Sequence, residues 1–133
     1  MKASKNCMGP RMRISKVEAL QQDLHRKGWG YELWIENRPE YCGKLLVFEA
    51  GKKCSMHFHM NKTETMYLQS GRIDIDILDP DTSERYTVCL HPGDSLLIER
   101  GTMHQICALR ASELFEFSTT HEDSDSYRIQ KGD

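Results

Sequence analysis

Apolar and polar side chains alternate along most of the chain after Tyr31, and this alternation predicts β-strands. The clearest case is the segment IDIDIL, in which Ile73, Ile75 and Ile77 share one face while the two aspartates take the other. Turn-forming Gly, Pro, Asn and Asp residues separate the expected strands, at 31–36, 43–50, 54–59, 64–69, 72–78, 85–90, 95–99, 103–109 and 113–119. Many short strands at near-regular spacing indicate a sandwich or a barrel. Strand alternation places Phe48, Met66, Leu68 and Ile106 on the inner face.

A helical period occurs only near the N-terminus. Ser15 and Glu18 fit a capping box, and a stripe of apolar residues at helical spacing follows, with Val17, Leu20 and Leu24. Gly28 is a natural end for this helix. We therefore expect a helix over about 16–27 on the outside of the barrel, with His25 on the protein surface. The expected organisation is an N-terminal extension and helix over residues 1–28 and one barrel domain over 29–133.

Composition narrows the classes of function. The formal net charge is −2 and the 18 basic residues are scattered, so the sequence gives no electrostatic case for binding nucleic acid. No apolar run approaches the roughly 20 residues that a membrane span needs, and the first residues lack the apolar stretch of a signal peptide. The five cysteines form no C-x-x-C pair, which favours free thiols. A cytoplasmic protein is expected.

Four residues have the types and spacings of a metal site. His57 and His59 are two apart on an expected strand, so their side chains face the same way. Glu64 begins the next strand after a short turn, and His104 comes from a distant strand. Three neutral imidazoles and one carboxylate suit Mn, Fe, Co, Ni or Zn. Four protein ligands leave positions open for water or substrate, which is typical of a catalytic site for one divalent ion.

These residues resemble the two sequence motifs of the cupin superfamily. The pattern G-(x)5-H-x-H-(x)4-E-(x)6-G is matched from Gly51 to Gly71, through His57, His59 and Glu64. The second motif is matched by Gly93, Gly101 and His104, whereas Glu99 and Ala108 stand where proline and asparagine are usual. The resemblance implies an all-β fold, the cupin double-stranded β-helix or jelly-roll barrel, here with one N-terminal helix. It also implies that the protein is a homodimer.

A narrower resemblance comes from the flanking segments. Trp29, Gly30, Glu32, Tyr41 and Lys44 are similar to the entry of type II mannose-6-phosphate isomerase cupin domains. The arrangement H-x-H-x-x-K-x-E, with Lys62 inside the ligand run, is similar to that of D-lyxose isomerase. Near the C-terminus, Glu116, Asp125 and Arg128 resemble positions in sugar-phosphate isomerases.

The resemblance and the metal site together favour a sugar or sugar-phosphate isomerase or epimerase that acts through a metal-stabilised enediolate. Lys62 and Glu116 are the candidate catalytic residues for moving the proton. Arg128 is a candidate for binding a phosphate or carboxylate, and Trp34 for stacking on the sugar. The expected partner is thus a small molecule, with no nucleic acid and no membrane.

Two alternatives stay open at this point. Three histidines and one glutamate also suit an Fe(II) dioxygenase, in which O₂ and substrate bind side by side on the iron. A non-enzymatic carbohydrate-binding or sensing cupin would use the same fold without turnover.

Overall fold

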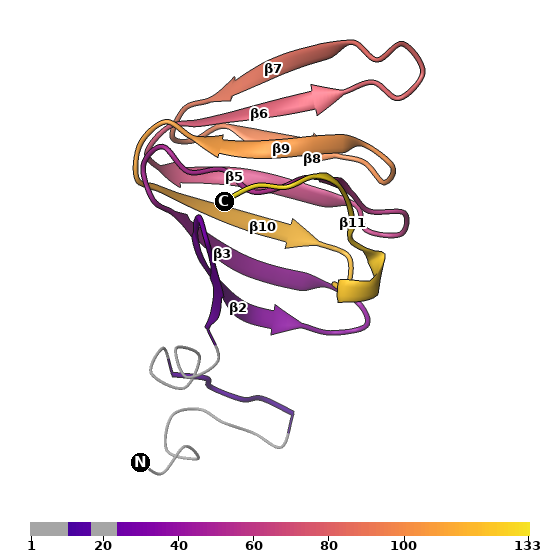
Figure 1. The fold of residues 1–133 in the computed structure, drawn as a ribbon. Coiled ribbons are helices and arrows are strands. Elements are labelled where there is room, and N and C mark those ends of the chain that lie inside the picture. Colours follow the sequence, from indigo (N-terminus) through magenta and orange to yellow (C-terminus); the bar gives the residue numbers. More distant parts are fainter. Residues whose placement is uncertain (1–10, 17–23) are drawn as a thin grey trace.

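The computed structural model describes residues 11–16 and 24–133, and it is built from β-strands (Figure 1). The strands are β1 (His25–Lys27), β2 (Gly30–Asn37), β3 (Cys42–Phe48), β4 (Met56–Phe58), β5 (Glu64–Ser70), β6 (Ile73–Leu78), β7 (Arg85–Leu90), β8 (Ser95–Ile98), β9 (Met103–Ala108), β10 (Ser112–Ser118) and β11 (Tyr127–Gln130). A 3₁₀ turn, η2 (Asp123–Asp125), precedes β11. No helix in the described part of the chain is long and apolar enough to cross a membrane.

The strands form two antiparallel sheets. One sheet has the order β1-β2-β3-β10-β5-β8, and the other has the order β11-β4-β9-β6-β7. All nine strands expected from the sequence are present, and no end differs by more than two residues. The all-β jelly-roll fold class is therefore confirmed, because strands distant in sequence, such as β3 and β10, lie side by side in one sheet.

Side-chain alternation divides the barrel interior into an apolar end and a polar end. Along β3 the buried residues run from Lys44 through Leu46 to Phe48, and along β10 they run from Glu116 through Leu114 to Ser112. The register places Glu116 opposite Lys44 and Leu114 opposite Leu46. The apolar end is filled by side chains from both sheets, including the four residues predicted to face inward: Phe48, Met66, Leu68 and Ile106. The polar end holds the candidate site.

The N-terminal helix predicted over 16–27 is not found at Lys16 or at residues 24–27, the part of this range that the structure describes. Residues 17–23 lie outside the described residues, but Lys16 and Leu24 are not helical and His25–Lys27 form β1. This strand pairs with β2, with His25 opposite Glu32, so His25 turns towards the barrel interior and is not a surface residue of a helix. Pairing with a sheet edge overrides local helix propensity here. The boundary predicted between residues 28 and 29 stays a prediction.

Candidate metal centre

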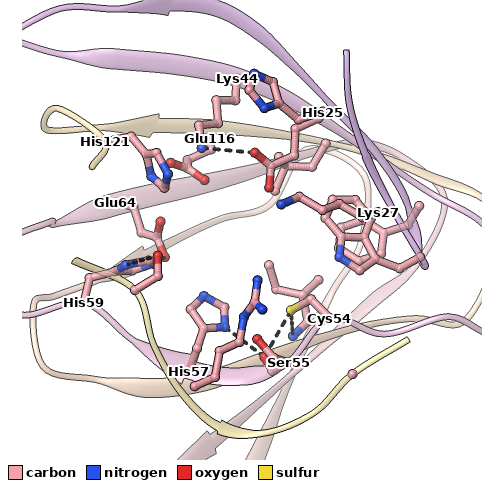
Figure 2. Close-up of a pocket in the computed structure, with 18 of the residues that line it drawn as sticks. His25, Lys27, Lys44, Cys54, Ser55, His57, His59, Glu64, Glu116 and His121 are labelled. Atoms are coloured by element: carbon pink, nitrogen blue, oxygen red, sulfur yellow. Dashed lines mark hydrogen bonds and ion pairs between the residues drawn. The ribbon is translucent and has the colours of Figure 1, made fainter. Parts of the chain in front are cut away.

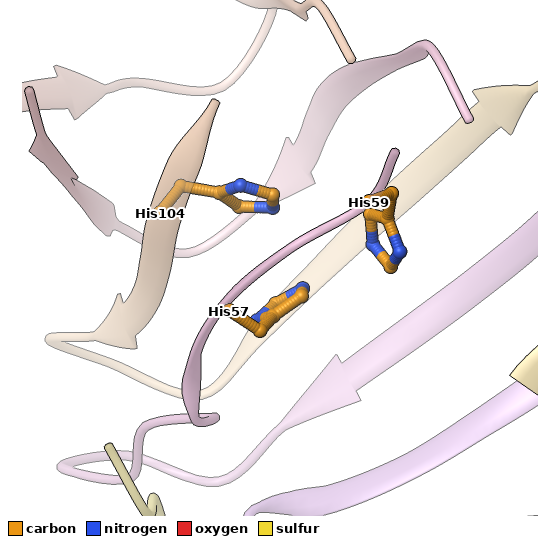
Figure 3. A group of neighbouring side chains, drawn as sticks. All are labelled: His57, His59 and His104. Carbon is orange, nitrogen blue, oxygen red and sulfur yellow. The ribbon is translucent and has the colours of Figure 1, made fainter. Parts of the chain in front are cut away.

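Three histidines meet at the polar end of the barrel (Figure 3). His57 on β4 lies directly opposite His104 on β9, so the two side chains share the inner face of that sheet. His59 follows just after β4 with the same orientation. The ring centroids of His57 and His104 are 4.5 Å apart, and one ring nitrogen from each of the three histidines falls within 4.8 Å of the others. The structure thus brings together three of the four predicted ligands as a cluster.

The tautomer of each histidine is fixed by the protein backbone. The Nδ1 atoms of His57, His59 and His104 lie 2.8, 3.0 and 2.9 Å from the carbonyl oxygens of Ser55, Asp125 and Thr102. A carbonyl oxygen can only accept, so each Nδ1 carries the proton and donates it. In a neutral ring with this tautomer, Nε2 presents a lone pair, which is the form in which imidazole binds a metal.

Glu64 is the fourth predicted ligand, and its position fits a cation. Its Oε1 atom lies 2.9 Å from His104 Nε2 and 3.9 Å from His59 Nε2. Both Oε1 and His104 Nε2 are buried, and neither atom has a hydrogen-bond partner outside this pair. Neighbouring ligands about 2.1 Å from an octahedral ion are separated by about 3 Å, close to the 2.9 Å between Glu64 Oε1 and His104 Nε2. The donor set and this orphaned pair therefore fit one divalent metal ion.

The pKa shifts of the ligands also favour binding of a cation. Burial lowers the pKa of His57 to about 3 and that of His59 to about 4, so both rings are neutral at physiological pH. Burial alone would raise the pKa of Glu64, but His104 and the Lys62 ammonium outweigh it, and the pKa is lowered. With neutral imidazoles, the ionised Glu64 carboxylate is the charged member of the four-ligand set, and its negative charge favours a cation.

Asp125 holds the loop that carries these ligands. It is a buried carboxylate in the 3₁₀ turn η2, and it accepts hydrogen bonds from the backbone N–H groups of Met60, Asn61 and Lys62 at 2.9–3.2 Å. Because the backbone carbonyl of Asp125 also accepts from His59, one residue positions both the ligand and the loop leading to Glu64. Asp125 resembles a position of sugar-phosphate isomerases, but no local sequence pattern predicts this positioning role.

Lys62 joins the metal centre to a second buried carboxylate. Its Nζ atom lies 2.9 Å from Glu116 Oε2, 3.3 Å from Glu64 Oε2 and 3.0 Å from His121 Nδ1, so all three ammonium hydrogens have acceptors. Although burial opposes the charge, Glu116 and Glu64 hold the pKa of Lys62 above its usual value. Burial, followed by the charge of Glu64, raises the pKa of Glu116. The two predicted catalytic residues are thus in direct contact beside the metal centre.

His121 extends this network towards solvent. Its Nδ1 accepts from Lys62, so its Nε2 carries the proton and donates to the exposed Asp123 carboxylate at 2.9 Å. The side chain of Asn37 clamps the backbone of His121 through both its N–H and its C=O. No spacing in the sequence connects His121 with Lys62, 59 residues away, so it was not assigned a role.

Trp34 lines the same cavity but is already in contact with protein groups. His25 stacks on its ring at a centroid distance of 3.9 Å, and the buried Lys44 ammonium lies 4.4 Å from the ring centroid. Trp34 Nε1 and Lys44 Nζ both donate to Glu32 Oε1, at 2.8 and 3.2 Å. A sugar ring could stack on Trp34 only in place of one of these groups.

These side chains surround one open cavity of about 690 Å³ (Figure 2). His57, His59 and Glu64 stand at one wall, and Glu116, Lys44 and His121 continue the polar lining. Arg128 on β11 lies opposite His57 in the register, so this predicted substrate-binding residue is also at the cavity. A cavity of this size accommodates a small molecule such as a monosaccharide derivative.

Comparison with known proteins agrees with this architecture. The family model described as Cupin matches residues 44–131. The capsular polysaccharide assembling protein CapF from Staphylococcus aureus superimposes with a TM-score of 0.72 at 16% identity, over 80% of this chain and 34% of CapF. Oxalate decarboxylase from Bacillus subtilis gives 0.70 at 16% identity, over 80% of this chain and 30% of the enzyme.

A third solved structure shares the fold. The oxalate decarboxylase of Lactobacillus farciminis, in a formate complex, gives a TM-score of 0.70 at 16% identity, over 80% of this chain and 33% of that one. The chain therefore spans about a third of the length of these solved structures, and the likeness shows the fold alone. Among curated proteins the comparison gave no match.

Proposed function

Because this chain belongs to the cupin family, we propose that its metal centre serves an isomerase or epimerase acting on a sugar or sugar phosphate. The observation that carries the proposal is the buried Lys62–Glu116 pair, which touches Glu64 of the metal centre. A purely structural or sensing site has no need for an acid–base pair next to open metal positions. Isomerisation needs both, because a proton must leave one carbon and return to its neighbour.

The two residues take different roles. The raised pKa of Glu116 brings this carboxylate towards the range of a base that works near neutral pH. Glu116 removes the proton from the carbon beside the carbonyl and returns it to the adjacent carbon. Lys62, whose pKa is raised, stays an ammonium, and it donates a hydrogen bond to the substrate oxygen in place of one of its three protein acceptors.

His57, His59, His104 and Glu64 would hold the metal ion. When bound, a divalent ion supplies a Lewis acid that polarises the carbonyl and stabilises the enediolate. Arg128, opposite His57, is placed to bind an anionic group of the substrate. Trp34 contributes to the cavity wall, with His25 occupying the stacking position in the described structure.

The proposal includes a homodimer. Ile35, Tyr41 and Phe117 are 42%, 52% and 55% exposed and line an apolar groove on the outer face of the six-stranded sheet. A face of this kind matches a second copy of itself in a two-fold contact. Light scattering should give a dimer for the wild type and a shift towards monomer for Phe117→Lys. A monomeric wild type would remove this part of the proposal.

The main test combines metal analysis with turnover. The protein is purified without chelator, its metal content is measured, and aldose–ketose interconversion is assayed across a panel of sugars and sugar phosphates. Glu116→Gln should retain the metal and lose most of the turnover. Bound iron with substrate-dependent O₂ uptake would instead establish a dioxygenase, and sugar binding without turnover would establish a sensing protein.

A further inference from the structure

The two strands that sequence patterns did not predict, β1 and β11, are edge strands that border the same cavity. β1 is the edge of one sheet and β11 is the edge of the other. Residues from both strands line the cavity, and the end of β1 approaches the segment after β11, where Gly28 packs against Asp133. The cavity mouth is therefore built from the edges of both sheets.

The carboxylates that line the cavity all have partners in the described chain, whereas three of the cations that line it have none. Its carboxylates all have partners: lysines for Glu32, Glu64 and Glu116, His121 for Asp123, and the backbone N–H of Lys53 for Asp133. Lys44 and Lys62 are the cations of the buried pairs. The other cations that line the cavity make no ion pair or hydrogen bond through their side chains within the described chain: Lys27, Arg128 and Lys131.

These three residues, the mouth cations, come from β1 and from β11 with the segment that follows it. On β1, His25 and Lys27 share the face turned to the cavity, and Figure 2 shows Lys27 reaching inward from its strand. On β11, Arg128 is opposite His57, so its side chain lies on the same face as that ligand. Lys27 and Arg128 are both exposed, so an incoming solute can reach them.

We propose that Lys27 and Arg128, with Lys131 beside them, form an oxyanion subsite that binds a phosphate or carboxylate of the substrate. This inference rests on the proposed function for the rest of the substrate and narrows its class to an anionic sugar derivative. The guanidinium of Arg128 binds an oxyanion through two parallel hydrogen bonds, and Lys27 adds a point charge. A neutral sugar would leave these cations without a partner.

The test measures binding, so it does not depend on turnover. Titration calorimetry on the full chain with added Mn²⁺ compares fructose 6-phosphate, glucuronate and fructose, with inorganic phosphate as a further probe. We expect the anionic ligand to bind at least roughly tenfold more tightly than fructose, and Lys27→Gln or Arg128→Gln to weaken it by roughly tenfold or more. The preference for fructose 6-phosphate or glucuronate identifies which oxyanion the subsite takes.

Arg26→Gln is the matched control, because Arg26 is adjacent on β1 but is not among the cavity residues. This variant removes the same charge and should bind as the wild type does. Equal affinity for fructose and both anions, or unchanged affinity in Lys27→Gln and Arg128→Gln, overturns the subsite while leaving the metal-dependent isomerase intact. Phosphate binding that requires Lys27 and Arg128, without binding of any sugar, supports the subsite and rejects the sugar isomerase.

Discussion

Replacing Lys62 by methionine should destabilise the fold in a way that depends on pH. The variant keeps the length of the side chain but removes an ammonium that lies 2.9 Å from Glu116 and 3.3 Å from Glu64. Two buried carboxylates are then left facing each other without a counter-charge. Breaking a buried ion pair by removing one partner typically costs about 3–5 kcal/mol, and we expect a loss of this size at pH 8.

The pH dependence follows from Glu116. Burial and Glu64 already raise its pKa in the wild type, and losing Lys62 raises it further. The folded variant then binds a proton that the unfolded chain, with a glutamate pKa of about 4.3, does not bind at pH 5. A raised carboxylate pKa therefore favours the folded state as pH falls, and the deficit at pH 5 should be smaller than at pH 8 by about 1–3 kcal/mol.

Urea unfolding followed by tryptophan fluorescence measures this loss, with chelator present so that metal binding does not contribute. Adding Glu116→Gln to Lys62→Met should recover about 2 kcal/mol, because it removes one of the two facing charges. Lys53→Met is the matched control on the surface, and we expect a change within about 0.5 kcal/mol. A deficit that is the same at pH 5 and pH 8, or a double variant as unstable as Lys62→Met, would refute the reasoning.

Three further predictions concern the metal centre. His104→Ala should lose the bound metal in elemental analysis, whereas the exposed His91→Ala should keep it; equal metal content in both would reject the ligand assignment. Without metal, the free energy of unfolding measured in urea titrations should fall by about 2–4 kcal/mol from pH 6.5 to pH 5. In the folded protein the pKa values of His57 and His59 are lowered to about 3 and about 4, so these histidines take up protons over this range only in the unfolded chain. A free energy of unfolding that does not change over this range would contradict those shifts. Asp125→Ala should cost about 1.5–3 kcal/mol and weaken metal affinity in competition titrations, since three backbone N–H groups lose their acceptor. Unchanged affinity would show that Asp125 does not position the ligands.

The sequence predicted the strands that alternate strongly and missed those that do not. β6 has three isoleucines on one face, and its bounds were predicted to within one residue. β1 has only three residues, all polar, and β11 is exposed throughout, so neither has a pattern of buried positions to detect. Both exist because a neighbouring strand offers free hydrogen-bonding groups, and pairing of that kind is not visible in local sequence.

The candidate site was predictable where its residues are close in sequence. His57, His59 and Glu64 fall within eight positions of one another, and strand geometry predicted that they lie together. Lys62, in the turn between them, was predicted from the resemblance to D-lyxose isomerase. The contact of Lys62 with His121 depends instead on the fold, as does the pairing of Arg128 with His57. The stacking of His25 on Trp34 had the further obstacle that a capping box upstream predicted a helix through His25.

Because backbone carbonyl groups fix the histidine tautomers, several residues around the metal centre can be substituted during evolution without loss of the metal site. Ser55, Asp125 and Thr102 contribute backbone oxygens there, and every amino acid that could replace them supplies the same oxygen. Mutational drift at Ser55 and Thr102 therefore leaves the imidazoles ready for a metal ion, as long as the chain path is kept. New substrate preferences can then evolve through the side chains at the cavity mouth without the cofactor being lost on the way.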